Sequence, residues 1–196
     1  MKFICIERQI PAQEVVQMIR NVRLTNHPDI QPYKNADINI VSAALFEPSA
    51  FYVLKSRLAF ARDVRDKLIV STGIDIFKMQ GGAEISIDGG PVYQLVPPIV
   101  EATPEGDKIL LDGIHRAAVA RELRIPLTVI EISNVDPEWP AYSKANPNGW
   151  SDLHECDTVP AVKKIYRDIP ERQLNYRDLY RDLPGTTGIR EVGAKE

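Results

Sequence analysis

Apolar residues recur along this chain with two different periods, and the place where one period gives way to the other predicts a strand followed by a helix. A short apolar run covers residues 108–111, as expected of a buried strand. Small and apolar residues then recur on one helical face, at Ala117, Ala120 and Leu123. Gly113 lies between the two patterns, where it permits a tight turn that other residues would strain. Residues 108–123 are therefore predicted to form a strand, a glycine turn and a helix.

The same reasoning predicts further elements on both sides of this segment. Alternating apolar residues predict strands, and three- and four-residue spacing predicts helices. Glycines break the apolar runs between residues 71 and 95, where Asp88-Gly89 is a hairpin signal. The expected strands cover 1–10, 37–46, 74–77, 83–87, 97–101 and 125–132, and the expected helices cover 11–23, 49–70, 159–168 and 171–182. We therefore expect an α+β fold with a mixed sheet and packed helices.

Loops and shifts in composition divide the chain into three parts of one compact unit. These parts are an N-terminal strand–helix extension (1–36), a core (37–133) and a C-terminal wrap of loop and helices (134–196). Within the core, residues 71–94 either shape an acceptor pocket or only decorate the sheet. The loop after the core is rich in proline and carries aromatic side chains, which either stack on a ligand or anchor the loop to the core. These aromatic residues are Trp139, Tyr142 and Trp150.

Composition and charge narrow the classes of protein that fit this pattern. With 44% hydrophobic and 26% charged residues, the chain has the composition of a globular protein rather than a disordered one. A net charge of -3 argues against nucleic acid or an anionic membrane as a partner. We find no signal peptide and no transmembrane segment, and the two distant cysteines suggest no disulfide framework. We therefore expect a cytoplasmic protein.

The predicted turn at residues 112–116 has the chemistry of an anion site. Unpaired N–H groups at a helix N-terminus, together with the partial positive charge of the helix dipole, attract phosphate. Gly113, Ile114 and His115 would present such groups, and Arg116 would clamp the anion with its planar guanidinium. Many glycine turns of this kind nevertheless bind nothing. The order of strand, turn, strand, helix and strand around this turn supports the functional interpretation.

The segment 96–132 resembles the ParB/sulfiredoxin superfamily, in which a strand leads into D-G-x-H-R, an alanine-rich helix and a closing strand. The resemblance implies a ParB/sulfiredoxin-like fold and the binding of nucleotide phosphates by Gly113, His115 and Arg116. Ile114 stands where sulfiredoxins have their catalytic cysteine, so repair of sulfinic acids is not expected. The second nucleotide motif and the helix-turn-helix of chromosome-partitioning proteins are not found. Free serine kinases are the most similar branch by motif.

This resemblance implies a kinase that transfers phosphate from ATP or ADP to a small hydroxyl compound, such as free serine, with Mg²⁺. Asp112, beside the phosphates, would hold Mg²⁺ or act as the base. In the family an acidic residue from an earlier segment lies near the substrate hydroxyl. Glu47 is the candidate here, to orient or deprotonate the hydroxyl, unless it is only a solvated acid before a helix. His115 and Arg116 would stabilise charge on the transferred group.

Two other functions fit the same residues. One alternative is a nucleotide-binding regulator that catalyses no reaction. The other is a ParB-like protein that binds or cuts DNA, although the negative net charge of the chain argues against it. Lys163 or Lys164 would reach the phosphates from a lid, but no spacing selects either. The acidic, histidine and cysteine residues at 152–157 lack the spacing of a recognised zinc motif. The choice among ATP, ADP and CTP and the oligomeric state stay open.

Overall fold

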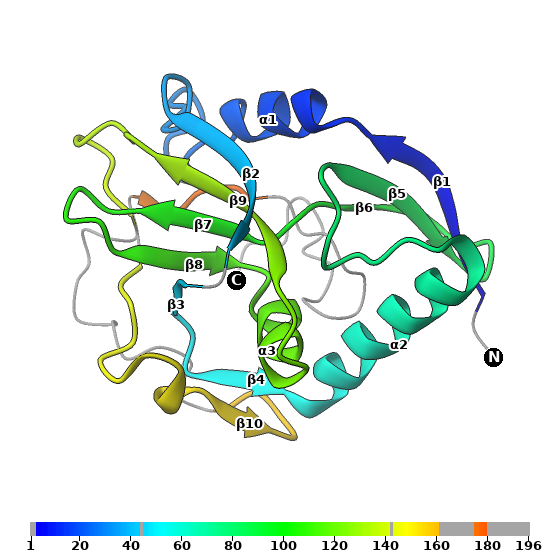
Figure 1. The fold of residues 1–196 in the computed structure, drawn as a ribbon. Coiled ribbons are helices and arrows are strands. Elements are labelled where there is room, and N and C mark those ends of the chain that lie inside the picture. Colours follow the sequence, from blue (N-terminus) through cyan, green and yellow to red (C-terminus); the bar gives the residue numbers. More distant parts are fainter. Residues whose placement is uncertain (1–2, 44, 142, 161–174, 180–196) are drawn as a thin grey trace.

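The computed structural model describes residues 3–43, 45–141, 143–160 and 175–179, and a mixed sheet lies at its centre (Figure 1). In order across the sheet, its strands are β2 (Asp37–Ala43), β9 (Leu127–Ser133), β7 (Ile99–Ala102), β8 (Lys108–Asp112) and β3 (Glu47–Pro48). The pairs β2/β9 and β7/β8 are antiparallel, whereas β7/β9 and β8/β3 are parallel. The sheet therefore mixes the two directions, as the sequence predicts.

Two smaller sheets flank the central one. The first sheet has the order β1-β5-β6 and is antiparallel throughout. Its strands are β1 (Ile4–Ile10), β5 (Gly82–Ile87) and β6 (Val92–Leu95). The second consists of two parallel strands, β4 (Tyr52–Leu54) and β10 (His154–Cys156). The N-terminal strand thus pairs with the segment between residues 71 and 95, which gives that segment a structural role.

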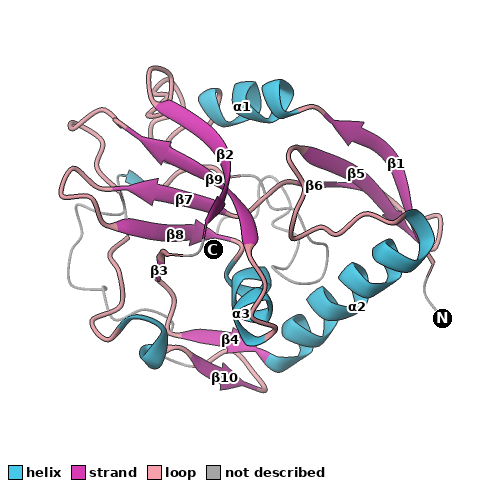
Figure 2. Ribbon diagram, in the orientation of Figure 1, coloured by secondary structure: helices cyan, strands magenta, loops and turns pink. Residues whose placement is uncertain are grey.

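Helices cover the two faces of the central sheet (Figure 2). They are α1 (Ala12–Arg20), α2 (Lys55–Thr72) and α3 (Ile114–Glu122), followed by a short 3-10 helix, η1 (Gly149–Asp152). No helix in the described part of the chain is both long and apolar enough to cross a membrane. The architecture is α+β, which confirms the predicted fold class.

Strand β9 shows how the core is built, because both of its faces are buried. Leu127 and Val129 belong to a cluster with buried residues of α2 and α3, whereas Ile130 and Ile132 belong to a cluster with α1. Successive strand residues point to opposite faces, so one strand supplies both clusters. The central sheet is therefore the middle layer, with α1 on one face and α2 and α3 on the other.

Three predicted boundaries are corrected by the structure. The helix predicted over 49–70 begins only at Lys55, because residues 52–54 pair with 154–156 instead. The run 74–77 is a turn rather than a strand, since the Asp75 carboxylate accepts hydrogen bonds from the Phe77 N–H and the Arg65 guanidinium. Of the helix predicted over 171–182, the structure describes only 175–179: residue 175 is in a 3-10 turn, 176–179 are not helical, and Arg177 forms an isolated bridge to Leu24. The helix predicted over 159–168 lies almost wholly outside the described residues.

A buried ion pair ties residues 175–179 to the sheet. The guanidinium of Arg177 lies 3.2 Å from Oε1 of Glu101, and the two side chains are 0% and 3% exposed. Tyr33 donates from its hydroxyl to Oε2 of Glu101 at 2.7 Å and accepts from Nε of Arg177 at 2.9 Å. Arg177 also donates to the carbonyls of Trp139 and Pro140. Burial raises the pKa of the Glu101 carboxyl, and Arg177 and Tyr33 oppose that rise.

The substitution Arg177→Met should destabilise the fold by about 3–5 kcal/mol, because it leaves the Glu101 carboxylate buried without its cation. The free energy of unfolding from urea denaturation measures the effect. The matched control is Arg8→Met, which removes an arginine from an exposed ion pair with Glu14. The control should change the free energy far less, and equal effects of the two substitutions would contradict the role given to the buried pair.

Candidate functional site

The glycine turn between β8 and α3 has the conformation that the sequence predicts. Gly113 adopts φ 86°, in the left-handed region, and its carbonyl accepts the Ala117 N–H at 3.0 Å to open the helix. A Cβ at this position would lie 2.6 Å from Cβ of Pro98. Only glycine therefore fits both the backbone angle and the close approach to Pro98. Asp112, half-buried, ends β8 immediately before the turn.

Helices α2 and α3 pack against each other and cross: α3 runs downward from the end of β8 in Figure 1, whereas α2 runs from the end of β4 to the upper right. At their N-terminal ends, the backbone N–H of Leu54, the residue before α2, donates to Nε2 of His115 at 3.2 Å. Further along, Arg62 of α2 forms an ion pair with Glu122 of α3. Both contacts join residues about two turns apart on each helix. The N-terminus of α2 therefore lies next to His115, in the first turn of α3.

His115 is held in its uncharged form at this junction. Burial, followed by the positive charge of Arg57, lowers the pKa of its imidazole from 6.5 to about 4. Because Nε2 accepts the Leu54 N–H, the proton of the neutral ring is assigned to Nδ1. His115 therefore offers a hydrogen-bond donor rather than a positive charge. Arg57, in the first turn of α2, supplies a positive charge that acts on this imidazole.

Arg116 points into the protein. Its side chain is 1% exposed, and Nη1 donates to the carbonyl oxygen of Val96 at 2.6 Å. Val96 precedes β7, so this bond holds the first turn of α3 against the sheet. That this guanidinium binds phosphate stays a prediction. In the structure its hydrogen bond to the Val96 carbonyl holds the helix in place. Arg57, which no sequence motif marked, brings positive charge to the turn instead.

Glu47 lies in the central sheet, but it is offset along the strand direction from the glycine turn. In the parallel pairing of β3 with β8, Glu47 is opposite Ile109, three residues before Asp112. That offset corresponds to about 10 Å along a strand. The Glu47 side chain is exposed and lies over Gly149, where a Cβ would collide with its carboxylate. The structure thus brings Asp112, Gly113, Ile114 and His115 together and leaves Glu47 at the edge of this group.

The other aromatic and charged candidates lie elsewhere. Trp150 packs edge-on against Phe46 with ring centroids 5.9 Å apart, and its indole N–H donates to the Phe46 carbonyl at 2.9 Å. Trp139 contacts the ring of His27. Both tryptophans anchor their loop to the protein, which is one of the two predicted alternatives. Tyr142, Lys163 and Lys164 lie outside the described residues.

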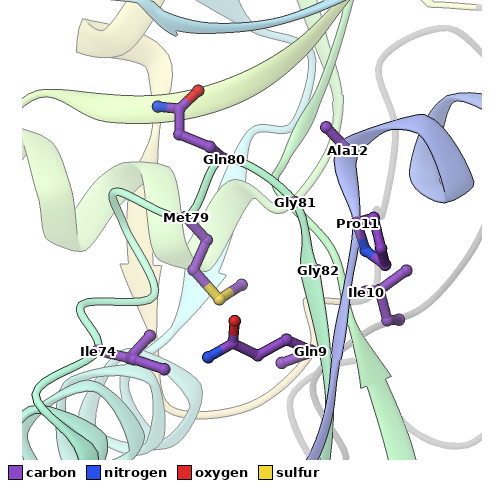
Figure 3. Close-up of a pocket in the computed structure, with 10 residues that line it drawn as sticks. Gln9, Ile10, Pro11, Ala12, Ile74, Met79, Gln80, Gly81 and Gly82 are labelled. Atoms are coloured by element: carbon purple, nitrogen blue, oxygen red, sulfur yellow. The ribbon is translucent and has the colours of Figure 1, made fainter.

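A cavity of about 380 Å³ opens between β1 and the segment before β5 (Figure 3). Its polar side chains are the neutral amides of Gln9 and Gln80, and Met79 and Ile74 line its apolar side. The lining includes no charged or titratable side chain. Within the described part of the chain there is also no cluster of three or more residues fit to hold a metal ion. The junction of α2, α3 and β8 is therefore the candidate functional site.

Sequence reasoning missed Arg57 and Leu54 as residues of this site. The helical spacing of residues 49–70 correctly indicated a helix, but it placed the N-terminus six residues too early, at residue 49 rather than 55. A correct start would have put Arg57 in the first turn and suggested an anion site there. The pairing of β4 with β10, which sets this start, joins segments about a hundred residues apart, and no local pattern reveals it.

Comparison with known proteins gives one family. The family model described as "ParB CE domain" matches residues 14–154. No curated protein and no solved structure matches the chain. The matched region includes the glycine turn, α2, α3 and the whole central sheet.

Replacement of Gly113 by alanine should destabilise the protein by about 2–4 kcal/mol, since it adds a collision with Pro98 to the strain of a left-handed backbone. Gly73→Ala is the matched control. Gly73 also has a positive φ, of 75°, but a Cβ there meets nothing within 4 Å, so strain alone should cost about 1 kcal/mol. Thermal or urea unfolding of the two variants measures the difference, and equal losses would contradict the close approach to Pro98.

His115 should make stability fall as the pH drops. The unfolded imidazole takes up a proton below pH 6.5, whereas the folded one resists protonation down to about pH 4. Protons therefore favour unfolding in this interval, and the accumulated loss approaches about 3 kcal/mol at its acid end. His115→Gln keeps an acceptor for the Leu54 N–H and does not titrate. Its urea unfolding should lose clearly less stability than wild type between about pH 7 and pH 4.5, and parallel losses would contradict the buried neutral imidazole.

Proposed function

This chain belongs to the ParB CE domain family, and on that premise we propose that it binds a nucleotide through its phosphates at the junction of α2, α3 and β8. The ParB-like part of the sequence resemblance is thereby confirmed. We further propose that the protein is a Mg²⁺-dependent kinase, which transfers phosphate from ATP or ADP to a small hydroxyl compound. The resemblance to free serine kinases suggests serine as the first acceptor to test.

One observation carries the proposal, namely that the residue before α2 is hydrogen-bonded to His115 in the first turn of α3, so that the two helix N-termini lie close together. Each helix N-terminus exposes N–H groups and about half a positive charge, and two of them side by side attract a polyphosphate more strongly than one. Arg57 adds positive charge there, and Nδ1 of neutral His115 adds a donor. Backbone donors of Gly113, Ile114 and His115 would bind the phosphate oxygens.

Asp112 is the residue that would hold Mg²⁺. This ion is commonly bound by one or two carboxylates together with substrate phosphates and water, so a single carboxylate beside the phosphate site fits its chemistry. Asp112 has the right position, since it directly precedes Gly113 at the end of β8. When bound, the ion would neutralise negative charge on the phosphates.

In the proposed transfer, the acceptor oxygen forms a bond to the terminal phosphorus. The bond from that phosphorus to the nucleotide oxygen breaks, and the proton of the acceptor hydroxyl passes to a carboxylate. Asp112 or Glu47 would take this proton. Glu47 is offset from Asp112 by about 10 Å along the strand. It would therefore contact the end of the acceptor that points away from the phosphates, and orient the acceptor.

A nucleotide-binding protein without chemistry is the second candidate. The burial of Arg116 and the neutral state of His115 favour it, because both leave the turn with less positive charge for a transition state than the motif alone implies. Such a protein would bind nucleotide and transfer no phosphate. No observation in the structure favours the third alternative, binding or cleavage of DNA.

Calorimetric titration with ATP, ADP, AMP and CTP, with and without Mg²⁺, tests the binding site. Arg57→Gln should weaken nucleotide binding by about tenfold or more, since it removes a charge that faces the phosphates. Arg62→Gln is the matched control, because it removes the same charge from the same helix but from the ion pair with Glu122. Equal affinities of the two variants, or no binding of any nucleotide to wild type, would refute the site.

Phosphorus NMR of wild type with nucleotide, Mg²⁺ and serine or other hydroxyl compounds then tests the transfer. Asp112→Ala should abolish transfer while nucleotide still binds. Transfer by this variant at the wild-type rate would refute the role of Asp112, and binding without transfer to any acceptor would establish the non-catalytic alternative.

A further inference from the structure

A second cavity, of about 340 Å³, lies beside α3 and combines apolar walls with two arginines. Its volume falls in the range of roughly 300–1,000 Å³ that is usual for small-molecule sites. The residues that matter here are Ala117 and Ala120 on the floor, Phe46 and Trp150 as an aromatic wall, and Arg121 and Arg124, both exposed, among the lining side chains.

This cavity is distinct from the nucleotide site. His115 and Glu122, which contact α2 and the residue before it, are seven residues apart and so share one side of α3. Ala117, Ala120 and Arg124 are related by steps of three and four residues and lie on the opposite side. The body of the helix therefore separates the cavity from the junction of the two N-termini.

Neither arginine has an acidic partner among the residues that the structure describes. Arg121 stacks on the ring of Trp150, with Cζ 5.2 Å from the ring centroid, and this contact holds its guanidinium over the aromatic wall. An ion pair would satisfy the charge of such a side chain, but the described residues offer none to Arg121 or Arg124. The helix C-terminus contributes only about half a negative charge against the two guanidinium groups.

The end of α3 fixes the position of Arg124. The Ile125 N–H donates to the Ala120 carbonyl and the Arg124 N–H to the Arg121 carbonyl, both at 3.0 Å, which is the hydrogen-bond pattern of a Schellman motif. The residue at this point of the motif is usually glycine, because its backbone is left-handed. Arg124 occupies it with φ 54°. An arginine thus stands at the mouth of the cavity at a position where glycine would be less strained.

We propose that this cavity binds a small aromatic carboxylate. The alanine floor and the Phe46–Trp150 wall would receive the ring, and Arg121 and Arg124 would bind the carboxylate, a group that the planar guanidinium matches well. Charge complementarity selects an anion, and the apolar lining selects a ring over a bare inorganic ion. The inference does not depend on nucleotide binding.

The test uses the full chain with 2-naphthoate as the probe, its neutral analogue 2-naphthamide and inorganic phosphate. Binding is followed by the ¹H–¹⁵N signal of the Trp150 indole, which is assigned from its loss in Trp150→Phe. We expect 2-naphthoate to shift this signal saturably and both comparison compounds to bind at least about tenfold more weakly. Equal binding of 2-naphthamide or of phosphate, or no saturable binding of 2-naphthoate, would overturn the proposal.

The substitutions Arg124→Gly and Arg121→Gln should each weaken 2-naphthoate binding by about tenfold or more. Arg124→Gly also relieves the left-handed strain, so the protein should remain folded and its thermal midpoint should not fall. Arg8→Gln, which removes a positive charge from β1, should leave binding unchanged. Unchanged affinity in both cavity variants would overturn the proposal, whatever the outcome of the nucleotide titrations with Arg57→Gln.

Discussion

The close contact between Gly113 and Pro98 is the constraint on which the rest of the site depends. Because the turn has no side chain, α3 begins directly against the segment that enters β7. This position lets the first turn of α3 bring His115 to the backbone of Leu54. The start of α2 is thereby joined to the first turn of α3. A larger residue at 113 would separate these ends.

Arg116 fixes the rotation of α3 about its own axis, and this rotation determines what each face of the helix does. Its bond to the Val96 carbonyl holds one face of the first turn against the sheet. His115 then faces α2, whereas Ala117 and Ala120 face the cavity of Trp150 and Phe46. One short helix therefore separates two chemically different surfaces. One is the proposed phosphate site, and the other has an apolar floor with guanidinium groups.

The fold class, the strand–turn–helix at 108–123 and most strand positions could be predicted from the sequence, because periodicity and a glycine turn are local signals. The N-terminus of α2 could not, since it depends on the pairing of residues 52–54 with 154–156. The same holds for Arg177, whose interaction with Glu101 joins residues distant in the sequence. The glycine turn was predicted at the correct residues, and its role as a binding site stays a prediction. Arg57 became visible only when the contact between the two helices was seen.

The D-G-x-H-R motif in this chain supports the architecture of the site as much as its chemistry. Gly113 makes the turn, His115 is neutral and bonded to a backbone N–H, and Arg116 is buried on a carbonyl. The positive charge that acts on His115 then comes from Arg57, which lies outside the motif. The motif residues therefore hold the start of α2 against the first turn of α3, and the charge that acts on His115 comes from the neighbouring helix.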